Sequence, residues 1–143
     1  MKIKIISVGK IKDKGIFQLC SKYKDRIKRF TKLEEVVLKS GSNYSENEKI
    51  VNHLKHSKGL HFALSEDGNS FNSNDFANKL SSIFGQLSFV IGGAEGLNEE
   101  AKANCDEIIS LSSMTFTHEM AQLFLLEQVY RAFTIKQNIK YHK

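Results

Sequence analysis

The sequence contains no proline and no tryptophan, and only two of its 143 residues are cysteines. Cys20 and Cys105 match no spacing of a metal site, and two cysteines this far apart make no disulfide framework. We expect two free thiols, the usual state in a reducing cytosol. No apolar run approaches the roughly 20 residues that cross a bilayer. Histidines and cysteines do not cluster, so we expect a cytoplasmic protein with no bound metal and no contact with a membrane.

The start of the chain indicates a strand. Charged and apolar residues alternate from Lys2 onward, whereas a signal peptide has a continuous apolar segment. The chain is 41% hydrophobic and 26% charged, which suits one soluble core. Its length is typical of one compact domain, and there is no linker, repeat or low-complexity segment. We therefore expect a single domain over residues 1–143.

Positive charge is concentrated at the two ends of the chain. Residues 1–32 hold eleven lysines and arginines and two acids, and residues 128–143 hold four and none. Residues 33–127 hold six lysines and fourteen acids. If the ends meet in space, they form a cationic face suited to the phosphate backbone of a nucleic acid. Solvated lysines without a partner would leave the same pattern.

Hydrophobic periodicity alternates between strand and helix along the chain. Strands are predicted over residues 2–8, 33–39, 60–64, 87–91 and 108–111. Helices are predicted over 14–30, 46–56, from Asn72 or Ser73, after Asn98, and over about 118–138, with the inner face of the first at Phe17, Leu19, Cys20, Tyr23 and Ile27. A turn is predicted at Ser65-Glu66-Asp67-Gly68. Such alternation predicts an α/β fold, a mostly parallel sheet with helices on both faces.

Ligands on sheets of this kind bind outside the carboxyl ends of the strands. The loops that follow Leu64, Ile91 and Leu111 are therefore the candidates for a ligand site. By pattern alone, an open flavodoxin-like sheet is the expected topology.

Three glycines, Gly92, Gly93 and Gly96, follow the strand that ends at Ile91. Their spacing matches neither the dinucleotide-binding nor the P-loop motif. Three glutamates crowd the start of the next helix: Glu95, Glu99 and Glu100. A helix N-terminus attracts anions, but these carboxylates would repel a pyrophosphate. A ligand with a positive or zwitterionic end, such as S-adenosylmethionine (SAM), suits the loop better, and a tight turn without a ligand is the alternative.

The segment from Leu111 to His118 is rich in small hydroxyl residues, which leave backbone amides and carbonyls accessible. Such groups suit the edge of an adenine. An ordinary loop with Thr117 as the cap of the next helix explains the same residues.

The last helix is apolar around much of its circumference, because residues 123–126 are Leu-Phe-Leu-Leu. A helix of this kind is buried on more than one side, which in so short a chain suggests a homodimer. Glu127 and Arg131 lie four residues apart and can pair. The chain ends in Tyr141-His142-Lys143, which is either a frayed tail or an aromatic and a titratable imidazole that stack on a base and deprotonate it.

At this point the sequence resembles a known family. The opening KIKIISVGKIK, the run FVIGGAEGL and the final LSSMTFTHEMAQLFLLEQVYRAFTIKQNIKYHK are similar to the RlmH family of the SPOUT superfamily. The resemblance covers the whole chain and is most specific from Phe89 onward. Its members are bacterial 23S rRNA (pseudouridine) N3-methyltransferases that use SAM.

The resemblance implies an α/β fold with a C-terminal trefoil knot, a single SPOUT domain and a homodimer. It implies a substrate in the large-subunit rRNA, a hairpin loop near the decoding centre of the assembled ribosome. The implied SAM contacts are Leu64, Gly92, Leu111, Ser112, Ser113, Met114, Thr115 and Phe116. Gly93 and Gly96 of the same glycine loop are further candidate SAM contacts.

With the tail chemistry, the resemblance makes His142 the candidate base, with Tyr141 and His118 lining the pocket. The candidate RNA contacts are Lys10, Lys12, Arg131, Lys140 and Lys143.

One position departs from the family pattern. Members commonly carry an arginine four residues after the motif histidine, and here His118 is followed at that spacing by Gln122. A glutamine supplies no cation, so a phosphate or substrate contact is lost or moved to Arg131 or a lysine. This departure keeps open a non-enzymatic ribosome-associated RNA-binding protein with the same fold. A flavodoxin-like nucleotide or flavin carrier is a further alternative, against which the acidic turn after Gly96 argues.

Overall fold

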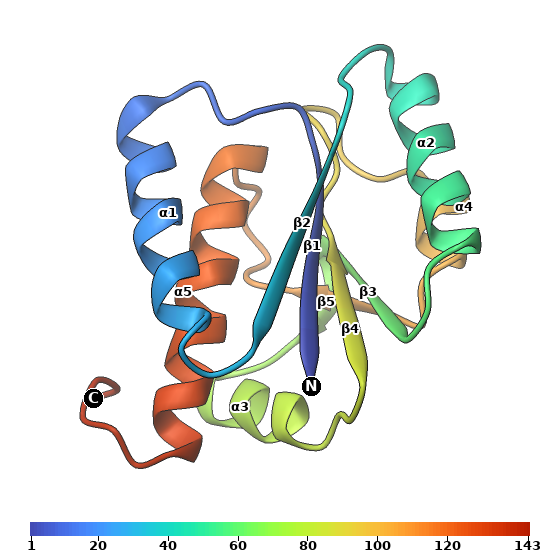
Figure 1. Cartoon of the computed structure of the whole chain (residues 1–143). Helices are drawn as coiled ribbons and strands as arrows, with labels where there is room; N and C mark the ends of the chain where they lie inside the picture. Colours follow the sequence, from blue (N-terminus) through green and yellow to red (C-terminus); the bar gives the residue numbers. More distant parts are fainter.

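Five parallel strands form the centre of the molecule in the computed structural model, which describes all 143 residues (Figure 1). Their order across the sheet is β2-β1-β4-β3-β5, and every neighbouring pair is parallel. The strands are β1 (Lys2–Val8), β2 (Lys32–Leu38), β3 (Leu60–Ser70), β4 (Gln86–Val90) and β5 (Glu107–Ser110).

Helices cover both faces of this sheet. They are α1 (Lys14–Ile27), α2 (Asn43–Lys55), α3 (Ser73–Ser81), α4 (Glu99–Ala103) and α5 (His118–Lys136). In Figure 1, α1, α3 and α5 lie on one side of the strands, and α2 and α4 lie on the other. The predicted α/β fold with helices on both faces is therefore confirmed. The predicted caps are confirmed as well: Asn72, Asn98 and Thr117 each accept a hydrogen bond from a backbone amide of the helix that follows.

The order of the strands differs from the flavodoxin-like order that the alternation alone favours. That order is 2-1-3-4-5, whereas here β3 and β4 have exchanged places and β3 pairs with both β4 and β5. Periodicity reports where a strand lies in the chain and carries no information about its neighbours. The exchange places β3 between β4 and β5, so residues 64–66 of β3 lie between the segments that follow those two strands.

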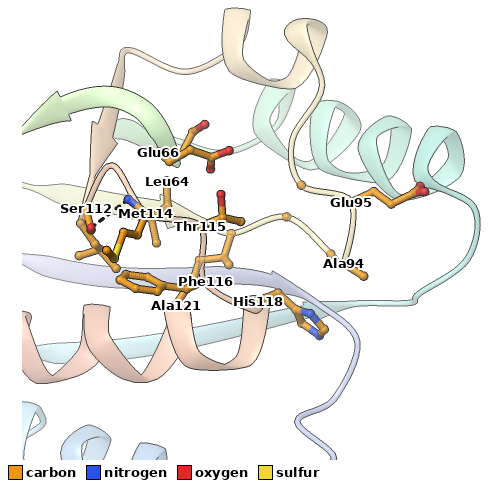
Figure 2. A pocket seen from close by; sticks show the side chains of 16 residues that line it. Leu64, Glu66, Ala94, Glu95, Ser112, Met114, Thr115, Phe116, His118 and Ala121 are labelled. Carbon is orange, nitrogen blue, oxygen red and sulfur yellow. Dashed lines mark hydrogen bonds between the residues drawn. The ribbon is translucent and has the colours of Figure 1, made fainter.

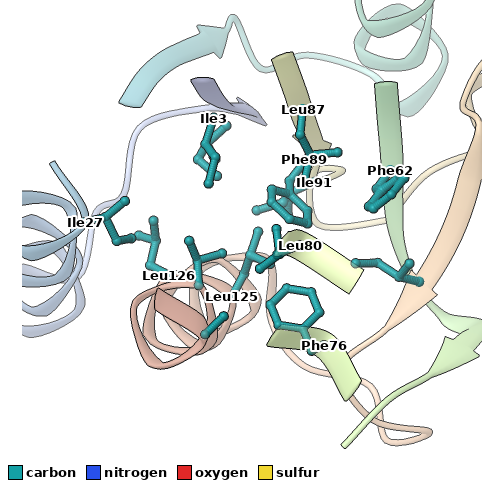
Figure 3. Close-up of a cluster of buried hydrophobic side chains, with 14 of the residues drawn as sticks. Ile3, Ile27, Phe62, Phe76, Leu80, Leu87, Phe89, Ile91, Leu125 and Leu126 are labelled. Atoms are coloured by element: carbon teal, nitrogen blue, oxygen red, sulfur yellow. The ribbon is translucent and has the colours of Figure 1, made fainter. Parts of the chain in front are cut away.

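Alternate side chains of the strands point to opposite faces of the sheet, where they belong to two separate hydrophobic cores. Ile3 and Ile5 of β1 and Phe89 of β4 face α1, α3 and α5 and are at most 1% exposed (Figure 3). Ile6 of β1 and Val90 of β4 face α2 and α4. Both faces of the central strands are therefore buried.

Helix α5 is buried by its own chain. It packs between α1 and α3 and against the sheet, and Leu125 and Leu126 are fully buried (Figure 3). Its apolar circumference is thus covered within one molecule. The apolar composition of this helix therefore does not by itself support the predicted homodimer.

The inner face of α1 was only partly predicted. Cys20, Tyr23 and Ile27 point inward as expected, but Phe17 and Leu19 are 53% and 42% exposed. The first inward residue is Ile16, because it lies four residues before Cys20 and thus on the same side of the helix.

Strand β3 continues where a turn was predicted. Its pairing with β5 breaks after Leu64 and resumes at Asn69, and the residues between them form an irregularity within the strand. Polar residues with one glycine are typical both of turns and of bulges, so composition alone cannot distinguish them. The helix predicted over residues 46–56 begins earlier, because Ser42 caps α2 and the helix begins at Asn43.

A polar row crosses the face of the sheet that α2 covers. Lys4, Ser88 and His61 are register partners on β1, β4 and β3, and all three are at most 7% exposed. The Lys4 ammonium donates to Ser57 Oγ at 2.9 Å and lies 3.3 Å from His53 Nε2. His61 Nε2 and Ser88 Oγ have no partner. A buried cation therefore stands beside two histidines that would each be costly to charge.

This row predicts acid sensitivity. Burial lowers the pKa of His61 and, together with the charge of Lys4, that of His53 below the ordinary 6.5. Below about that pH the unfolded chain binds more protons than the native chain, so stability present at neutral pH is lost as the pH falls. We expect the free energy of unfolding in urea to decline below pH 6.5 by up to about 1.4 kcal/mol per pH unit for each histidine.

The His61→Gln variant is expected to have a shallower decline than wild type. The matched control is His56→Gln, which changes an exposed histidine at the C-terminus of α2. Equal slopes for wild type and His61→Gln would show that His61 does not couple folding to protons.

Candidate functional site

The irregular part of β3, predicted as a loop after Leu64, and the loops after β4 and β5 converge on a cavity of about 190 Å³ at the N-terminus of α5 (Figure 2). In Figure 2 the glycine loop with Ala94 lies on one side, and Met114 and Phe116 lie on the other. The lining residues are Leu64, Ser65, Glu66, residues 91–96, Leu111, Ser112, Met114, Thr115, Phe116, His118 and Ala121. Because β3 pairs with both β4 and β5, these three segments lie side by side.

The glycine loop is a tight turn whose two arms touch. Gly93 and Gly96 form an isolated antiparallel bridge, and Gly96 N donates to Gly93 O at 3.0 Å. A Cβ on Gly92 would lie 2.6 Å from the carbonyl carbon of Gly96. Gly96 itself has a φ of +78°, a conformation that side chains disfavour. The glycines are thus required by the turn itself, and the turn forms one wall of the cavity.

The opposite wall is a loop with free backbone amides. Ser112 Oγ accepts from Met114 N at 3.0 Å, and Ser110 Oγ donates to the Ser112 carbonyl at 2.7 Å. These two bonds hold the loop, while the amides of Thr115 and Phe116 donate to no group of the chain. Free amides beside an apolar cavity can recognise the polar edge of a flat ligand.

The charge of the cavity is negative. Glu66 and Glu95 line it, and no lysine or arginine does. A pyrophosphate would meet two carboxylates and no cation, so this lining is unfavourable for a phosphate. The two carboxylates suit a ligand that carries a positive charge.

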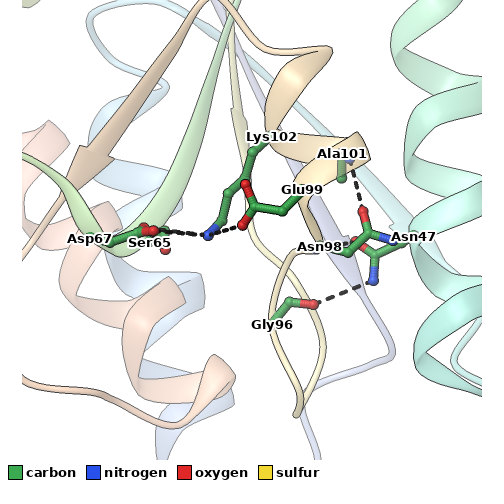
Figure 4. A network of polar contacts seen from close by, with 8 residues as sticks. All are labelled: Asn47, Ser65, Asp67, Gly96, Asn98, Glu99, Ala101 and Lys102. Atoms are coloured by element: carbon green, nitrogen blue, oxygen red, sulfur yellow. Dashed lines mark hydrogen bonds and ion pairs between the residues drawn. The ribbon is translucent and has the colours of Figure 1, made fainter.

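Helix α4 contacts both the irregular part of β3 and the residues that anchor the glycine loop (Figure 4). Lys102 pairs with Asp67 of β3 at 3.1 Å and with Glu99 at 3.7 Å. At the other end of α4, Asn98 N donates to Asn47 Oδ1 of α2 at 2.9 Å. The glycine loop and the irregular part of β3 are thus fixed to one another through α4.

The C-terminal tail is held on its own chain, away from the cavity. The Tyr141 hydroxyl donates to Glu127 Oε1 at 3.0 Å and lies 3.2 Å from the hydroxyl of Tyr23 on α1. Arg131 forms an ion pair with Glu127, lies over the Tyr141 ring and donates to His142 Nδ1 at 3.1 Å. The tail is therefore ordered, and the Glu127–Arg131 pair holds it.

The three candidate catalytic residues do not meet within one chain. His118 lines the cavity, whereas His142 contacts Arg131, thirteen residues further along the same helix. At 1.5 Å per residue this is a separation of about 20 Å. Tyr141 stays with His142.

Among the candidate SAM residues, only Ser113 does not line the cavity. The cavity also contains six residues that were not predicted as site residues: Ser65, Glu66, Ile91, Ala94, Glu95 and Ala121. Ser65 and Glu66 are the first two residues after a predicted strand, and that position is the signal that was available for them.

The candidate RNA contacts fall at opposite ends of α5. Lys10 and Lys12 are exposed on the loop after β1, whose Lys12 and Asp13 amides donate to Glu119 in the first turn of α5. Lys140 and Lys143 are exposed in the tail. The basic α1 and the tail do lie together, through Tyr23 and Tyr141. The two basic ends of the sequence therefore meet in space, as one of the two explanations of the charge pattern requires.

Gln122, the position that departs from the family pattern, is 5% exposed. It lies beside Ala121 on α5 but does not line the cavity. Because the side chain at this position is buried, it cannot contact a phosphate at the surface of the single chain.

A second cavity of about 430 Å³ adjoins the first and shares Leu111 and Phe116 with it. Its lining residues are Phe71, Asn72, Ser73, Phe76, Ile109, Ser110, Leu111, Phe116, Phe124, Glu127 and Gln128. Because Glu127 also holds the tail, this cavity connects the two parts of the candidate site.

Comparison with known proteins agrees with the observed fold. A family model described as "Predicted SPOUT methyltransferase" matches residues 1–142. This chain belongs to the SPOUT methyltransferase family. Proteins named "Ribosomal RNA large subunit methyltransferase H" are similar along its whole length. The one from Dictyoglomus thermophilum is 39% identical, with 99% of each chain covered, and the one from Streptococcus thermophilus is 35% identical, with 100% covered.

Among solved structures, a probable methylase family protein from Haemophilus influenzae Rd KW20 superimposes with a TM-score of 0.63. It is 15% identical, and the match covers 99% of this chain and 70% of the other. At that identity the likeness supports the fold alone. Two further observations complete the description: none of the helices is long and apolar enough to span a membrane, and no three histidine, cysteine or acidic side chains are grouped as metal ligands.

The Gly92→Ala variant tests whether the turn dictates its glycines. Its Cβ would press on the Gly96 backbone at 2.6 Å, and we expect a loss of about 1–3 kcal/mol in the free energy of unfolding in urea. The matched control is Gly15→Ala in the first turn of α1, where a Cβ meets only Asp13 Oδ1 at 3.3 Å. If both variants unfold at the wild-type urea concentration, the close approach of the two arms is not a constraint.

Proposed function

We propose that this chain is a SAM-dependent methyltransferase that methylates N3 of a pseudouridine in a 23S rRNA hairpin loop near the decoding centre of the assembled ribosome. The observation that carries the proposal is the cavity at the N-terminus of α5. It is formed by the irregular part of β3 and the loops after β4 and β5, and it has carboxylates but no lysine or arginine in its lining. The names of the full-length relatives support the large-subunit rRNA as substrate.

The residues of the cavity fit SAM. When bound, SAM supplies a methyl group on a positively charged sulfonium. Glu66 and Glu95 would favour that charge, and the free amides of Thr115 and Phe116 would face the adenine edge. Leu64 and Leu111 supply apolar surface. No metal is required for the transfer, because the two reacting groups need alignment and a base.

SAM binding is the first test. Calorimetry should show SAM and S-adenosylhomocysteine binding with a dissociation constant in the micromolar range, around the 1 μM–1 mM usual for enzyme substrates. Mass mapping of large-subunit rRNA should then show one additional methyl group on a pseudouridine when ribosomes are incubated with the protein and SAM. Naked rRNA is the comparison substrate.

The alternatives give other results. Binding to ribosomes without binding of SAM would identify a non-enzymatic RNA-binding protein that has kept the fold. A flavodoxin-like carrier would bind flavin and be coloured, but the order of β3 and β4 already differs from that fold.

In its observed position, His142 is not ready to act as a base. An arginine only donates, so His142 Nδ1 accepts from Arg131 and the ring proton lies on Nε2. Tyr141 is no substitute, because burial and its bonds to Tyr23 and Glu127 raise the pKa of the phenol. For His142 to take the N3 proton of the substrate, its contact with Arg131 must be exchanged for a contact with the substrate.

We infer that the tail acts on the cavity of a second subunit. Within one chain the tail lies about 20 Å along α5 from His118, and Tyr141 is anchored between α1 and α5. In a homodimer, the second cavity, which runs from Phe116 to Glu127, offers the partner a place next to the methyl donor. His142 of the partner subunit would then face the substrate while this chain holds SAM.

Two inactive variants test this arrangement when they are mixed. His142→Ala keeps an intact cavity, and Thr115→Trp fills the cavity but keeps an intact tail. We expect His142→Ala to bind SAM normally and to methylate ribosomes at least ~100-fold more slowly. Mixed dimers should regain about a quarter of the wild-type activity, because half of the dimers are mixed and each has one complete site.

No recovery on mixing would place the tail at its own cavity, and a wild-type rate for His142→Ala would remove it from the chemistry. Light scattering is the control for assembly, and a 16.2 kDa species at micromolar concentration would contradict the dimer.

A further inference from the structure

The glycine loop forms a wall of the cavity but has few bonds of its own. Its two arms are joined by the bridge between Gly93 and Gly96. The Gly96 carbonyl, at the end of the second arm, points away toward α2 and accepts from side chains there. Whatever holds that carbonyl decides where the wall lies.

Two asparagines of α2 hold it. Asn43 Nδ2 donates to Gly96 O at 3.2 Å, and Asn47 Nδ2 lies 3.4 Å from the same oxygen (Figure 4). Asn47 is 1% exposed and uses both ends of its amide. Its Nδ2 also donates to the Asn43 carbonyl at 2.9 Å, and its Oδ1 accepts from Asn98 N at 2.9 Å.

The bond from Asn98 N to Asn47 Oδ1 matters because of where Asn98 lies. Its side chain caps α4 through Ala101 N at 2.9 Å, so its own backbone is the point where the glycine loop becomes a helix. Asn47 therefore fixes the end of the loop and the start of α4 with one side chain. A carboxylate of the same helix, Glu46, is 7% exposed and fills the space behind Gly93.

We propose that Asn47 is a positioning residue for the methyl donor: it sets the position of the glycine loop from outside the cavity, without contact with the ligand. The inference rests on the proposed binding of SAM in this cavity. A side chain that combines a donor and an acceptor is required, because Gly96 O must be met by a donor and Asn98 N by an acceptor. Among residues of this shape, only asparagine supplies both.

The Asn47→Asp variant separates this role from simple packing. It keeps the size of the side chain and the bond to Asn98 N, but it places a carboxylate oxygen against the carbonyls of Gly96 and Asn43. We expect the dissociation constant for SAM to rise about tenfold, because the cavity must form against that repulsion. The matched control is Asn52→Asp, on the exposed side of the same helix, where the amide side chain has no hydrogen bond.

Steady-state kinetics distinguish a positioning role of Asn47 from a purely structural one. A displaced loop weakens SAM in the ground state and in the transition state alike, so the KM for SAM should rise while kcat at saturating SAM stays near wild type. Amide hydrogen exchange should accelerate over residues 92–96 in Asn47→Asp and not in Asn52→Asp. If Asn47→Asp does not fold, Asn43→Ala removes one donor to the same carbonyl and should raise the KM in the same direction by less.

Two negative results are distinguishable. If the wild type binds SAM and Asn47→Asp binds it equally well while its melting temperature falls, Asn47 is structural and the positioning role is wrong. If the wild type itself does not bind SAM in calorimetry, the proposed function fails and the positioning role fails with it.

Discussion

The position of β3 between β4 and β5 is the constraint on which the candidate site depends. Hydrogen bonds to both neighbours and burial of Phe62 and Ala63 hold this strand in the sheet. Because the pairing is parallel, residues 64–66 of β3 and the loops after β4 and β5 lie at the same edge of the sheet, where α5 begins. In the flavodoxin-like order, β3 would instead lie between β1 and β4 and would not pair with β5.

The cavity is kept in place by residues outside it. Lys102 holds the irregular part of β3, and Asn47 holds the glycine loop and the start of α4. These contacts come from α2 and α4, the layer on the far side of the sheet from α5. Both helical layers thus contribute to one site. The tail adds a third contribution, since the pair of Glu127 and Arg131 holds Tyr141 and His142 well away from the cavity of the same chain.

Much of the fold and part of the site could be predicted. Strands appeared as apolar runs of the right length, and Asn72, Asn98 and Thr117 were recognisable as caps because a short side-chain acceptor before a periodic segment has few other uses. Of the three glutamates around Gly96, only Glu95 lines the cavity, and Glu99 and Glu100 do not. The inner face of α1 was predicted in part, since Phe17 is as apolar as the residues that are buried. Glu66 and Asn47 were missed, because a polar residue outside a motif gives no sign of its partners.

The sequence by itself determined which segments are strands and helices, where most of the helices begin, and which loops carry unusual residues, because these properties depend on neighbours along the chain. The tertiary structure alone decided the exchange of β3 and β4, the burial of α5 between α1 and α3, and the separation of His118 from His142. Each of these depends on which distant surfaces meet, and hydrophobic periodicity is the same whichever surface covers it.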